Sequence, residues 1–428
     1  MYYLFAFNAT IVCLFLFVVS RKYGTILNPI GLVSWFYLMA AVIVPAYSYS
    51  LGLLSAYDRV LPMASVLSSV YFGAVGLTFL IQRSPFRTFF RALFELMRPI
   101  ELREETNGLS RLLLFVQAGV LFVVLMSLSG AGLLWITNSR EAYQHYRVGV
   151  AVWWASCQAV LMLAYVCALF RKVKSPIRII PTVLFFSAIT LFFGSKASVL
   201  GYFVIGLVYL HFRVRPIRTK AVIAAGLLLV ACFMWLQIYQ GTAQGVLESF
   251  LYFDYFNNSA AFLAQFHDFG FRYGQVGLSE VWFYVPRAIY PAKPFAFGDV
   301  LITDAMFPGF AEMGATPGLL PWTEGYADFG VLGVVLYALL TGFFWKGIYE
   351  LFLERRDIQS LMLFGQAGAI SHFQVFLNAP MPVFLVWLTC EIVVIRLVSM
   401  VTIPLPKLML WPRCIRFRVL GSSRIKWG

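Results

Sequence analysis

Charged side chains are scarce in this sequence, and acidic ones are the scarcest. Only 12% of the 428 residues are Asp, Glu, Lys or Arg, whereas 61% are hydrophobic and the mean hydropathy is +0.80. A soluble domain of this size could not bury so much apolar surface. The apolar residues form continuous runs of about 20 instead of the short alternating segments of a membrane β-barrel. The sequence therefore predicts an all-α, polytopic helical membrane protein.

Signatures of metal, disulfide and nucleic-acid binding are also lacking. The six cysteines include no Cys-x-x-Cys pair and no His/Cys cluster, and none lies in a predicted external loop, so we expect neither structural zinc nor disulfides. The acids of the outer segments form no Asp-x-Asp pair, and nothing calls for a metal or cofactor. No basic soluble domain with interleaved aromatics accompanies the net charge of +14, so nucleic acid is not an expected partner.

About eleven apolar stretches are long enough to be membrane spans. The first has no basic segment before it and ends at Arg21-Lys22 instead of a small-residue cleavage site, so we expect a span and no signal peptide. Two short stretches could form one hairpin that turns at Gly194-Ser195-Lys196. The spans are expected near 2–20, 26–49, 62–81, 112–129, 150–170, 179–193, 198–212, 221–239, 331–349, 361–378 and 382–402.

The spans divide the chain into four parts. Residues 1–239 would form an N-terminal bundle of about eight spans, 240–330 a large external loop, 331–402 about three further spans, and 403–428 a basic tail. A structureless loop of this length is uncommon, so short or re-entrant helices are expected in it. No internal repeat is visible, which weakens an interpretation as a secondary transporter.

The Lys and Arg residues indicate the orientation of the chain. Alternate gaps between the spans hold 26 of the 33, and the other gaps hold 7. The positive-inside rule then places the N-terminus outside and the basic tail inside. Arg140, Lys196, Arg287 and Lys293 are exceptions on the outer side, which indicates an anionic ligand there.

Two outer segments carry cations at spacings suited to a phosphate. If the stretch Thr137 to Arg147 is helical, Arg140 and Arg147 share one face with Tyr143, and Arg presents a bidentate fork. The alternative is ordinary anchoring at the membrane edge. Lys196 follows Gly194-Ser195, which would let a phosphate approach the backbone; alternatively, it is a Lys that reaches the membrane surface from a turn.

The large loop adds a rigid cationic segment. Arg287 and Lys293 lie between three prolines in the stretch Pro286 to Pro294, and proline fixes φ and reduces the entropy lost on binding. The alternative is a rigid connector with solvated charges.

Three residues are candidates for a general base. Glu324 precedes a span and could accept a proton from a sugar hydroxyl, or else pair with an arginine or stabilise a helix N-terminus. Asp328 is a weaker candidate of the same kind. His372 lies in the tenth predicted span, where a titratable residue is often functional and a hydrogen-bonded core histidine is the alternative.

Three of these places carry a resemblance to a known family. The chain resembles the bacterial O-antigen polymerases, the oligosaccharide repeat-unit polymerases, in its hydropathy plan with one large late external loop. The motifs are Gly194-Ser195-Lys196, where the family commonly has Gly-Ser-Arg; Pro286-Arg287 with Tyr290-Pro291 and Lys293-Pro294; and Pro317, Glu324-Gly325-Tyr326, Phe329-Gly330 and Gly333. Lys196 departs from the family's arginine, so a bidentate phosphate contact is not implied there.

The resemblance implies a glycosyltransferase at the periplasmic face of the bacterial inner membrane. A growing glycan on a polyprenyl pyrophosphate would pass to the terminal sugar of a lipid-linked repeat unit. Arg287, Lys196 and Arg140 would stabilise the leaving pyrophosphate, supported by Lys293 and Arg147, and Glu324 or else His372 would take the acceptor proton. Tyr290 and Tyr326 are candidates for stacking on sugars. Membrane lipid is a further partner, and a chain-length regulator stays open.

Three other functions stay open from the sequence. An O-antigen ligase would use the same donor with a different acceptor. A lipid-linked oligosaccharide transporter would have cations along an intramembrane cavity, whereas here they lie at the outer ends of spans. A membrane O-acyltransferase needs a catalytic His deep in the membrane, for which His372 is the one candidate.

Overall fold

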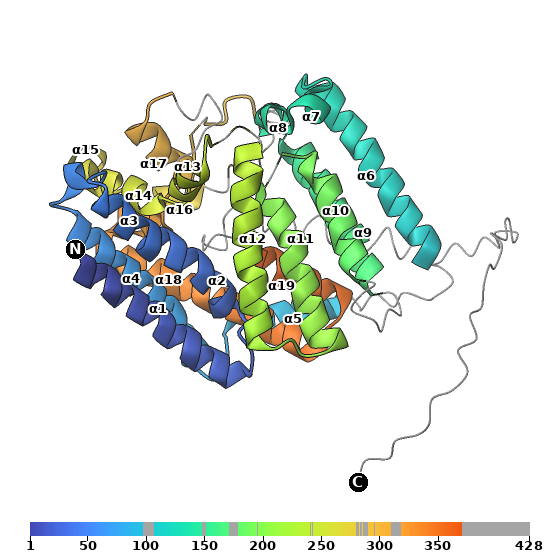
Figure 1. Ribbon diagram of the computed structural model, residues 1–428, viewed down its shortest axis with the longest axis horizontal. Coiled ribbons are helices and arrows are strands. Elements are labelled where there is room, and N and C mark those ends of the chain that lie inside the picture. The colour runs from blue at the N-terminus through green and yellow to red at the C-terminus, as the bar shows by residue number, and fades with distance from the viewer. Residues whose placement is uncertain are drawn as a thin grey trace, which may run out of the picture.

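The computed structural model is a bundle of helices, with every regular element of its described residues helical (Figure 1). It describes residues 1–96, 107–147, 151–170, 179–194, 196–239, 241, 243–279, 282, 285, 290–294, 296–309 and 318–369. Five helices are long and apolar enough to cross a membrane, and four shorter apolar helices accompany them. The predicted all-α, multi-pass class is confirmed.

Most of the predicted spans are helices in the structure. The helices are α1 (Tyr2–Tyr23), α2 (Pro29–Leu38), α3 (Val44–Ser50), α4 (Leu61–Leu80), α5 (Phe86–Leu96), α6 (Asn107–Ser129), α7 (Leu134–Thr137), α8 (Ser139–Arg147), α9 (Ala151–Leu169), α10 (Ile179–Leu191), α11 (Lys196–Tyr209), α12 (Thr219–Tyr239), α18 (Trp322–Arg355) and α19 (Ile358–Ala369). The predicted span at 382–402 and the end of the one at 361–378 lie outside the described residues, so the count of eleven stays a prediction.

Small residues let the central helices approach closely. In α18, a side chain at Gly342 would overlap the Thr78 hydroxyl of α4, and in α4, one at Gly76 would overlap the Phe15 ring of α1. Helices within a bilayer have little hydrophobic force between them, so close packing across small residues is a main source of their association. These contacts make α1, α4 and α18 one packed unit.

Polar side chains inside this unit are bonded to one another. The buried Asn8 amide of α1 donates to Ser65 Oγ of α4 at 3.0 Å, and Ser69 donates to Asn8 Oδ1. Trp322, at the start of α18, donates from its indole nitrogen to Ser68 Oγ at 3.0 Å. An unpaired polar group would be costly in such apolar surroundings, so these bonds fix the register of the three helices.

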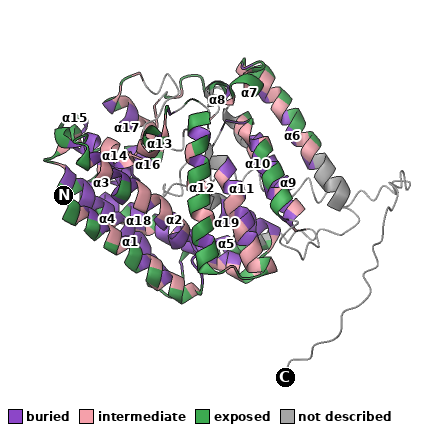
Figure 2. Ribbon diagram, viewed as in Figure 1, coloured by how far each residue is buried: buried purple, intermediate pink, exposed green. Residues whose placement is uncertain are grey.

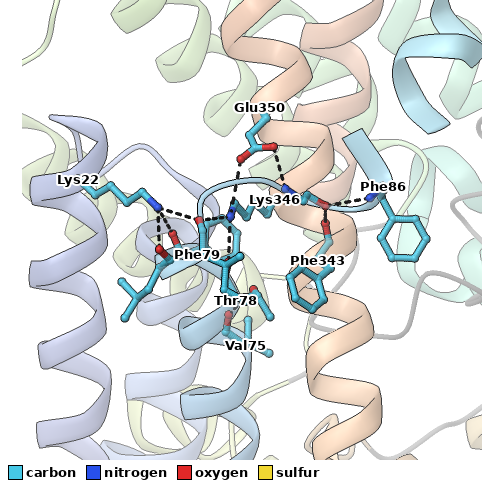
Figure 3. A network of polar contacts seen from close by, with 11 residues as sticks. Lys22, Val75, Thr78, Phe79, Phe86, Phe343, Lys346 and Glu350 are labelled. Atoms are coloured by element: carbon cyan, nitrogen blue, oxygen red, sulfur yellow. Dashed lines mark hydrogen bonds and ion pairs between the residues drawn. The ribbon is translucent and has the colours of Figure 1, made fainter. Parts of the chain in front are cut away.

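Two lysines bond to the C-terminal end of α4 (Figure 3). Lys22 Nζ donates to the carbonyl oxygens of Phe79, Leu80 and Ile81 at 2.8, 3.1 and 3.0 Å. Lys346 Nζ of α18 donates to the Thr78 oxygen at 3.1 Å and also to that of Ile81. The last carbonyls of a helix have no hydrogen-bond partner within the helix, and these ammonium groups supply one. Their positive charge also interacts favourably with the negative end of the helix dipole.

The second part of the bundle is more open to its surroundings. Helices α6, α9, α10, α11 and α12 lie beside the first unit, and Figure 2 shows broad exposed stretches on α6 and α12. On α12 the exposed side chains include Leu227, Leu228 and Trp235, and on α6 they include Val120 and Val123. Large exposed apolar faces of this kind suit contact with lipid.

The large loop contains the short helices that its length predicted. They are α13 (Val246–Leu251), α14 (Tyr255–Ala264), α15 (Phe266–Phe269), α16 (Gln275–Ser279) and α17 (Asp299–Met306). They lie at the end of the bundle that also carries α7 and α8, and α5 lies toward the other end (Figure 1).

A half-buried carboxylate ties this loop to the bundle. Asp254 accepts a hydrogen bond from Ser48 Oγ at 2.7 Å and another from the Asn257 amide at 3.2 Å, which caps α14. Burial raises the pKa of the Asp254 carboxyl, and these two hydrogen bonds partly offset that effect. The loop helices are therefore fixed to the end of α3.

We expect Lys346→Met to destabilise the fold more than Lys22→Met. The Lys346 side chain is fully buried, and its Nζ lies 3.8 Å from Glu350 Oε1. Its removal leaves Glu350 without its ion-pair partner and the Thr78 carbonyl without its ammonium donor, at a cost of about 2–3 kcal/mol in the free energy of unfolding. Lys22 is exposed, and water can replace its bonds. Thermal unfolding of the purified variants in one detergent measures the difference; equal losses would contradict the capping role of Lys346.

Candidate functional site

The helix that carries Arg140 and Arg147 begins at a capped end. Asn138 Oδ1 accepts a hydrogen bond from the Glu141 backbone amide at 3.2 Å, and Asn138 Nδ2 donates one to Glu141 Oε2 at 3.2 Å. Asn138 is therefore the N-cap of the helix, and Glu141, the third helical residue, holds the capping side chain in place. The stretch is helical as α8, Ser139–Arg147. Its register therefore puts positions 140, 143 and 147 on one face.

The turn between α10 and α11 packs directly on α8. Gly194 adopts φ 69°, a conformation that L side chains rarely take. A Cβ there would lie 2.6 Å from Tyr143 Cβ and would overlap the carbonyl oxygen of Ser139. Only glycine fits this contact, which explains why a glycine precedes the predicted cation.

This contact brings two of the predicted cationic segments together. The helix α11 begins at Lys196, two residues after Gly194, and Arg140 is the residue after Ser139. The N-terminus of α11 also presents backbone N–H groups and the positive end of its dipole to the same region. The sequence placed both segments outside but gave no sign that they touch, because the contact depends on tertiary packing of α10 and α11 against α8.

The start of α9 completes this region. The Trp154 ring packs edge-to-face on Tyr143 of α8, with ring centroids 5.5 Å apart. One turn further along, Gln158 lies on the same face of α9. Trp154 Nε1 and Gln158 Nε2 are both shielded from solvent and have no hydrogen-bond partner in the described part of the chain. The sequence interpretation missed both residues, although a Gln inside an apolar run was a usable signal.

The segment around Glu324 is a sharp bend and not one straight helix. Phe329 and Gly330 have non-helical backbone angles, with φ 61° at Gly330, so α18 consists of a short first arm and a long spanning arm. The two arms touch at Gly325 and Gly333: a Cβ at Gly325 would lie 2.7 Å from the Gly333 oxygen. Gly325, Gly330 and Gly333 therefore allow the bend, because a side chain at Gly325 or Gly333 would collide with the other arm and Gly330 has a positive φ.

Glu324 itself is enclosed within the first arm. Only 5% of the residue is exposed, and the carboxyl lies within electrostatic reach of the Tyr71 and Tyr337 hydroxyls. A buried carboxyl beside hydroxyl groups is a plausible setting for proton transfer.

Asp328 has a structural position in the same arm. It is fully buried, accepts from the amides of Val276 and Gly277 at 2.9 Å each, and accepts from the Tyr337 hydroxyl at 2.6 Å. Its oxygens cap the start of α16 and fix the loop to the bend. Because its oxygens already accept three hydrogen bonds, Asp328 is poorly suited to accept a proton from a substrate. This agrees with the sequence analysis, in which it was a weaker candidate base than Glu324.

The aromatic candidates of the loop lie in two different settings. Tyr290 is 45% exposed and stacks on Trp282 with ring centroids 5.5 Å apart, so one face of the pair is open. Lys293 Nζ lies 4.7 Å from the centre of the Phe297 ring. Tyr326 is half-buried and packs on Phe266 at 4.9 Å, within the aromatic contacts that join α15 to α18. Tyr290 is thus the more accessible of the two tyrosines that the sequence predicted to stack on sugars.

The remaining predicted residues are not placed. Arg287 and His372 lie outside the described residues, and for Arg140, Arg147 and Lys196 only the backbone positions are described. Within the described ranges, no group of three or more His, Cys, Asp or Glu side chains is arranged to hold a metal ion. The assignments of these residues to a site stay predictions.

Comparison with known proteins supports the resemblance seen in the sequence. Two curated proteins named O-antigen polymerase, from Salmonella typhimurium (strain LT2) and Salmonella typhi, are each 28% identical to this chain over 231 residues. The match covers 52% of this chain and 54% of each relative, so the chain spans about half the length of the curated relatives it matches. No family model matches, and no solved structure matches.

We predict that Gly194→Ala destabilises the protein more than Gly130→Ala. Both glycines have positive φ, which costs an alanine about 1 kcal/mol in unfolding free energy, but a Cβ at Gly130 meets nothing within 4 Å. At Gly194 the overlap with α8 raises the expected loss to roughly 2–4 kcal/mol. Thermal unfolding in detergent compares the two; similar losses would show that α8 and the α10–α11 turn are not held in this contact.

Proposed function

We propose that this protein polymerises polyprenyl-pyrophosphate-linked oligosaccharide repeat units at the periplasmic face of the bacterial inner membrane. The product would be an O-antigen, capsule or exopolysaccharide. The observation that carries the proposal is the match to two curated O-antigen polymerases, joined to a helical membrane fold in which two outer cationic segments meet.

The chemistry is a glycosyl transfer with a diphosphate leaving group. An acceptor hydroxyl oxygen attacks the anomeric carbon of the donor glycan, and the bond from that carbon to the lipid pyrophosphate oxygen breaks. The hydroxyl proton goes to Glu324 or else His372, and the electron pair leaves with the pyrophosphate. Arg287, Lys196 and Arg140 stabilise the charge that develops on it, with Lys293 and Arg147 in support.

The proposed orientation places the large loop and α8 outside. The N-terminus would then be periplasmic, the basic tail 403–428 cytoplasmic, and the four-part division of the chain would follow the membrane boundaries. Two features support this. The helices α7, α8 and α13–α17 share one end of the bundle, and α5, whose sequence contains Arg87 and Arg91, lies toward the other end (Figure 1). Arg87 and Arg91 of α5 pair there with Glu354 at 3.1 and 2.7 Å.

The proposal also defines the partners. The donor and acceptor are both lipid-linked oligosaccharides, so each reaches the site along the membrane with its diphosphate at the bilayer edge. Surrounding lipid contacts the exposed apolar faces of α6 and α12. A chain-length regulator is a possible further partner, and no metal, cofactor or nucleic acid is needed for the transfer.

Loss of the Arg287 charge should abolish polymerisation. We expect a gene-deletion strain complemented with wild type to make long glycans, and one complemented with Arg287→Ala to make glycans of a single repeat, since removal of a charge-stabilising group lowers such rates by about a hundredfold or more. Gel ladders of the extracted glycans give the result. Arg59→Ala is the matched control, because Arg59 is an exposed arginine outside the candidate segments.

Each other pattern of glycans would reject the proposal in a specific way. Long polymer that stays unattached in the deletion strain would identify a ligase. Repeat units that accumulate on the inner face would identify a transporter. Equal ladders for Arg287→Ala and Arg59→Ala, at equal protein level, would remove Arg287 from the catalytic set.

A further inference from the structure

Two neighbouring donors in α9 lack a hydrogen-bond partner. Trp154 Nε1 and Gln158 Nε2 are shielded from solvent and unpaired, as judged over the residues that the structure describes. Nearly all buried polar atoms in folded proteins are paired, and an unpaired one is an unexplained cost. Two on one face of one helix, a turn apart, indicate a ligand that supplies the acceptor.

These donors lie next to the two cationic segments. Trp154 packs on Tyr143 of α8, and Tyr143 in turn contacts Gly194 at the α10–α11 turn. Gly194 precedes the start of α11 at Lys196 by two residues, and α8 carries Arg140. Trp154 and Gln158, within the first two turns of α9, therefore lie near α8 and the start of α11.

The kind of atom left unpaired restricts the ligand. Both of these shielded atoms are N–H donors. A sugar hydroxyl is both donor and acceptor, and it would be matched best by a mixed set of protein groups. The oxygens of an ionised phosphate only accept hydrogen bonds, so a phosphate fits two donors beside cations better.

We propose that Trp154 and Gln158 are substrate-positioning residues that donate hydrogen bonds to phosphate oxygens of the lipid carrier's diphosphate. This inference rests on the proposed function for the identity of the lipid diphosphate. Lysine gives a point charge with little directional demand, whereas an indole and an amide N–H are directional. The cations attract the diphosphate, and the two neutral donors fix how it lies.

Binding of a short lipid diphosphate to full-length protein in nanodiscs tests the inference. Geranylgeranyl diphosphate is the probe, and geranylgeraniol, which has the same tail without phosphate, is its neutral counterpart. We expect Trp154→Phe and Gln158→Met each to raise the Kd for the diphosphate about tenfold, as for the loss of one hydrogen bond to a charged group. The Kd for geranylgeraniol should not change.

The melting temperature of the ligand-free protein separates positioning from a structural role. Gln158→Met removes a donor that has no partner among the described residues and keeps the length of the side chain, so it should not lower the melting temperature. Trp154→Phe also removes part of the ring that packs on Tyr143, so a small loss in its melting temperature is expected, and its test is the change in Kd for the diphosphate without a change for geranylgeraniol. Trp153→Phe is the matched control, because Trp153 is the neighbouring residue and is 39% exposed. It should leave both the Kd and the melting temperature as in wild type.

Three outcomes would overturn the inference. One is a Kd for the diphosphate that changes no more in Trp154→Phe and Gln158→Met than in Trp153→Phe. Another is an equal weakening for diphosphate and alcohol, which would indicate packing against the lipid tail. The third is a wild type that binds both probes alike. Glycan ladders of the same variants distinguish failure of this inference from failure of the proposed function. If the ladders show that the protein is a ligase while the variants still bind the diphosphate more weakly, the polymerase function is rejected and the diphosphate site is retained.

Discussion

The structure depends on one constraint: polar groups inside so apolar a chain must find their partners within the protein. The ends of helices are where this constraint is hardest to meet, because their last carbonyls lack partners in the helix. At the end of α4 the chain meets it with two ammonium groups, Lys22 from α1 and Lys346 from α18. The same bonds that satisfy the carbonyls therefore also join three helices, and the packed unit of α1, α4 and α18 follows from them.

The same constraint separates structural polar residues from candidate functional ones. Asp328 looked like a possible base in the sequence, yet its oxygens accept three hydrogen bonds and fix the loop to the bend of α18. Trp154 and Gln158 attracted no attention in the sequence, yet their donors are shielded from solvent and have no partner among the described residues. A polar residue in an apolar run is by itself a weak sign of function. Whether its polar atoms have hydrogen-bond partners in the fold distinguishes a structural residue from a candidate functional one.

Hydropathy predicted the class of the fold and most of the spans because the length of an apolar run is a local property. The bend of α18 was not predicted, since Phe329-Gly330 reads as a helix start and the contact of Gly325 with Gly333 forms only once the two arms fold together. For the site, sequence reasoning predicted outer cations from the charge distribution, and these assignments stay predictions. It could not place Gly194 against Ser139, because that contact is long-range and leaves no periodic pattern.

The lysine at position 196 is consistent with this division of roles. An arginine there would hold a phosphate by its own planar fork, and direction would come from the cation itself. A lysine at the start of α11 contributes charge, to which the helix N-terminus adds. In the proposed site, direction then comes from other groups. The N–H groups of Trp154 and Gln158 are candidates, because they have no partner among the described residues and Trp154 packs on Tyr143 of α8. In a site of this kind, neutral residues orient the ligand, and an analysis of the charged residues in the sequence does not identify them.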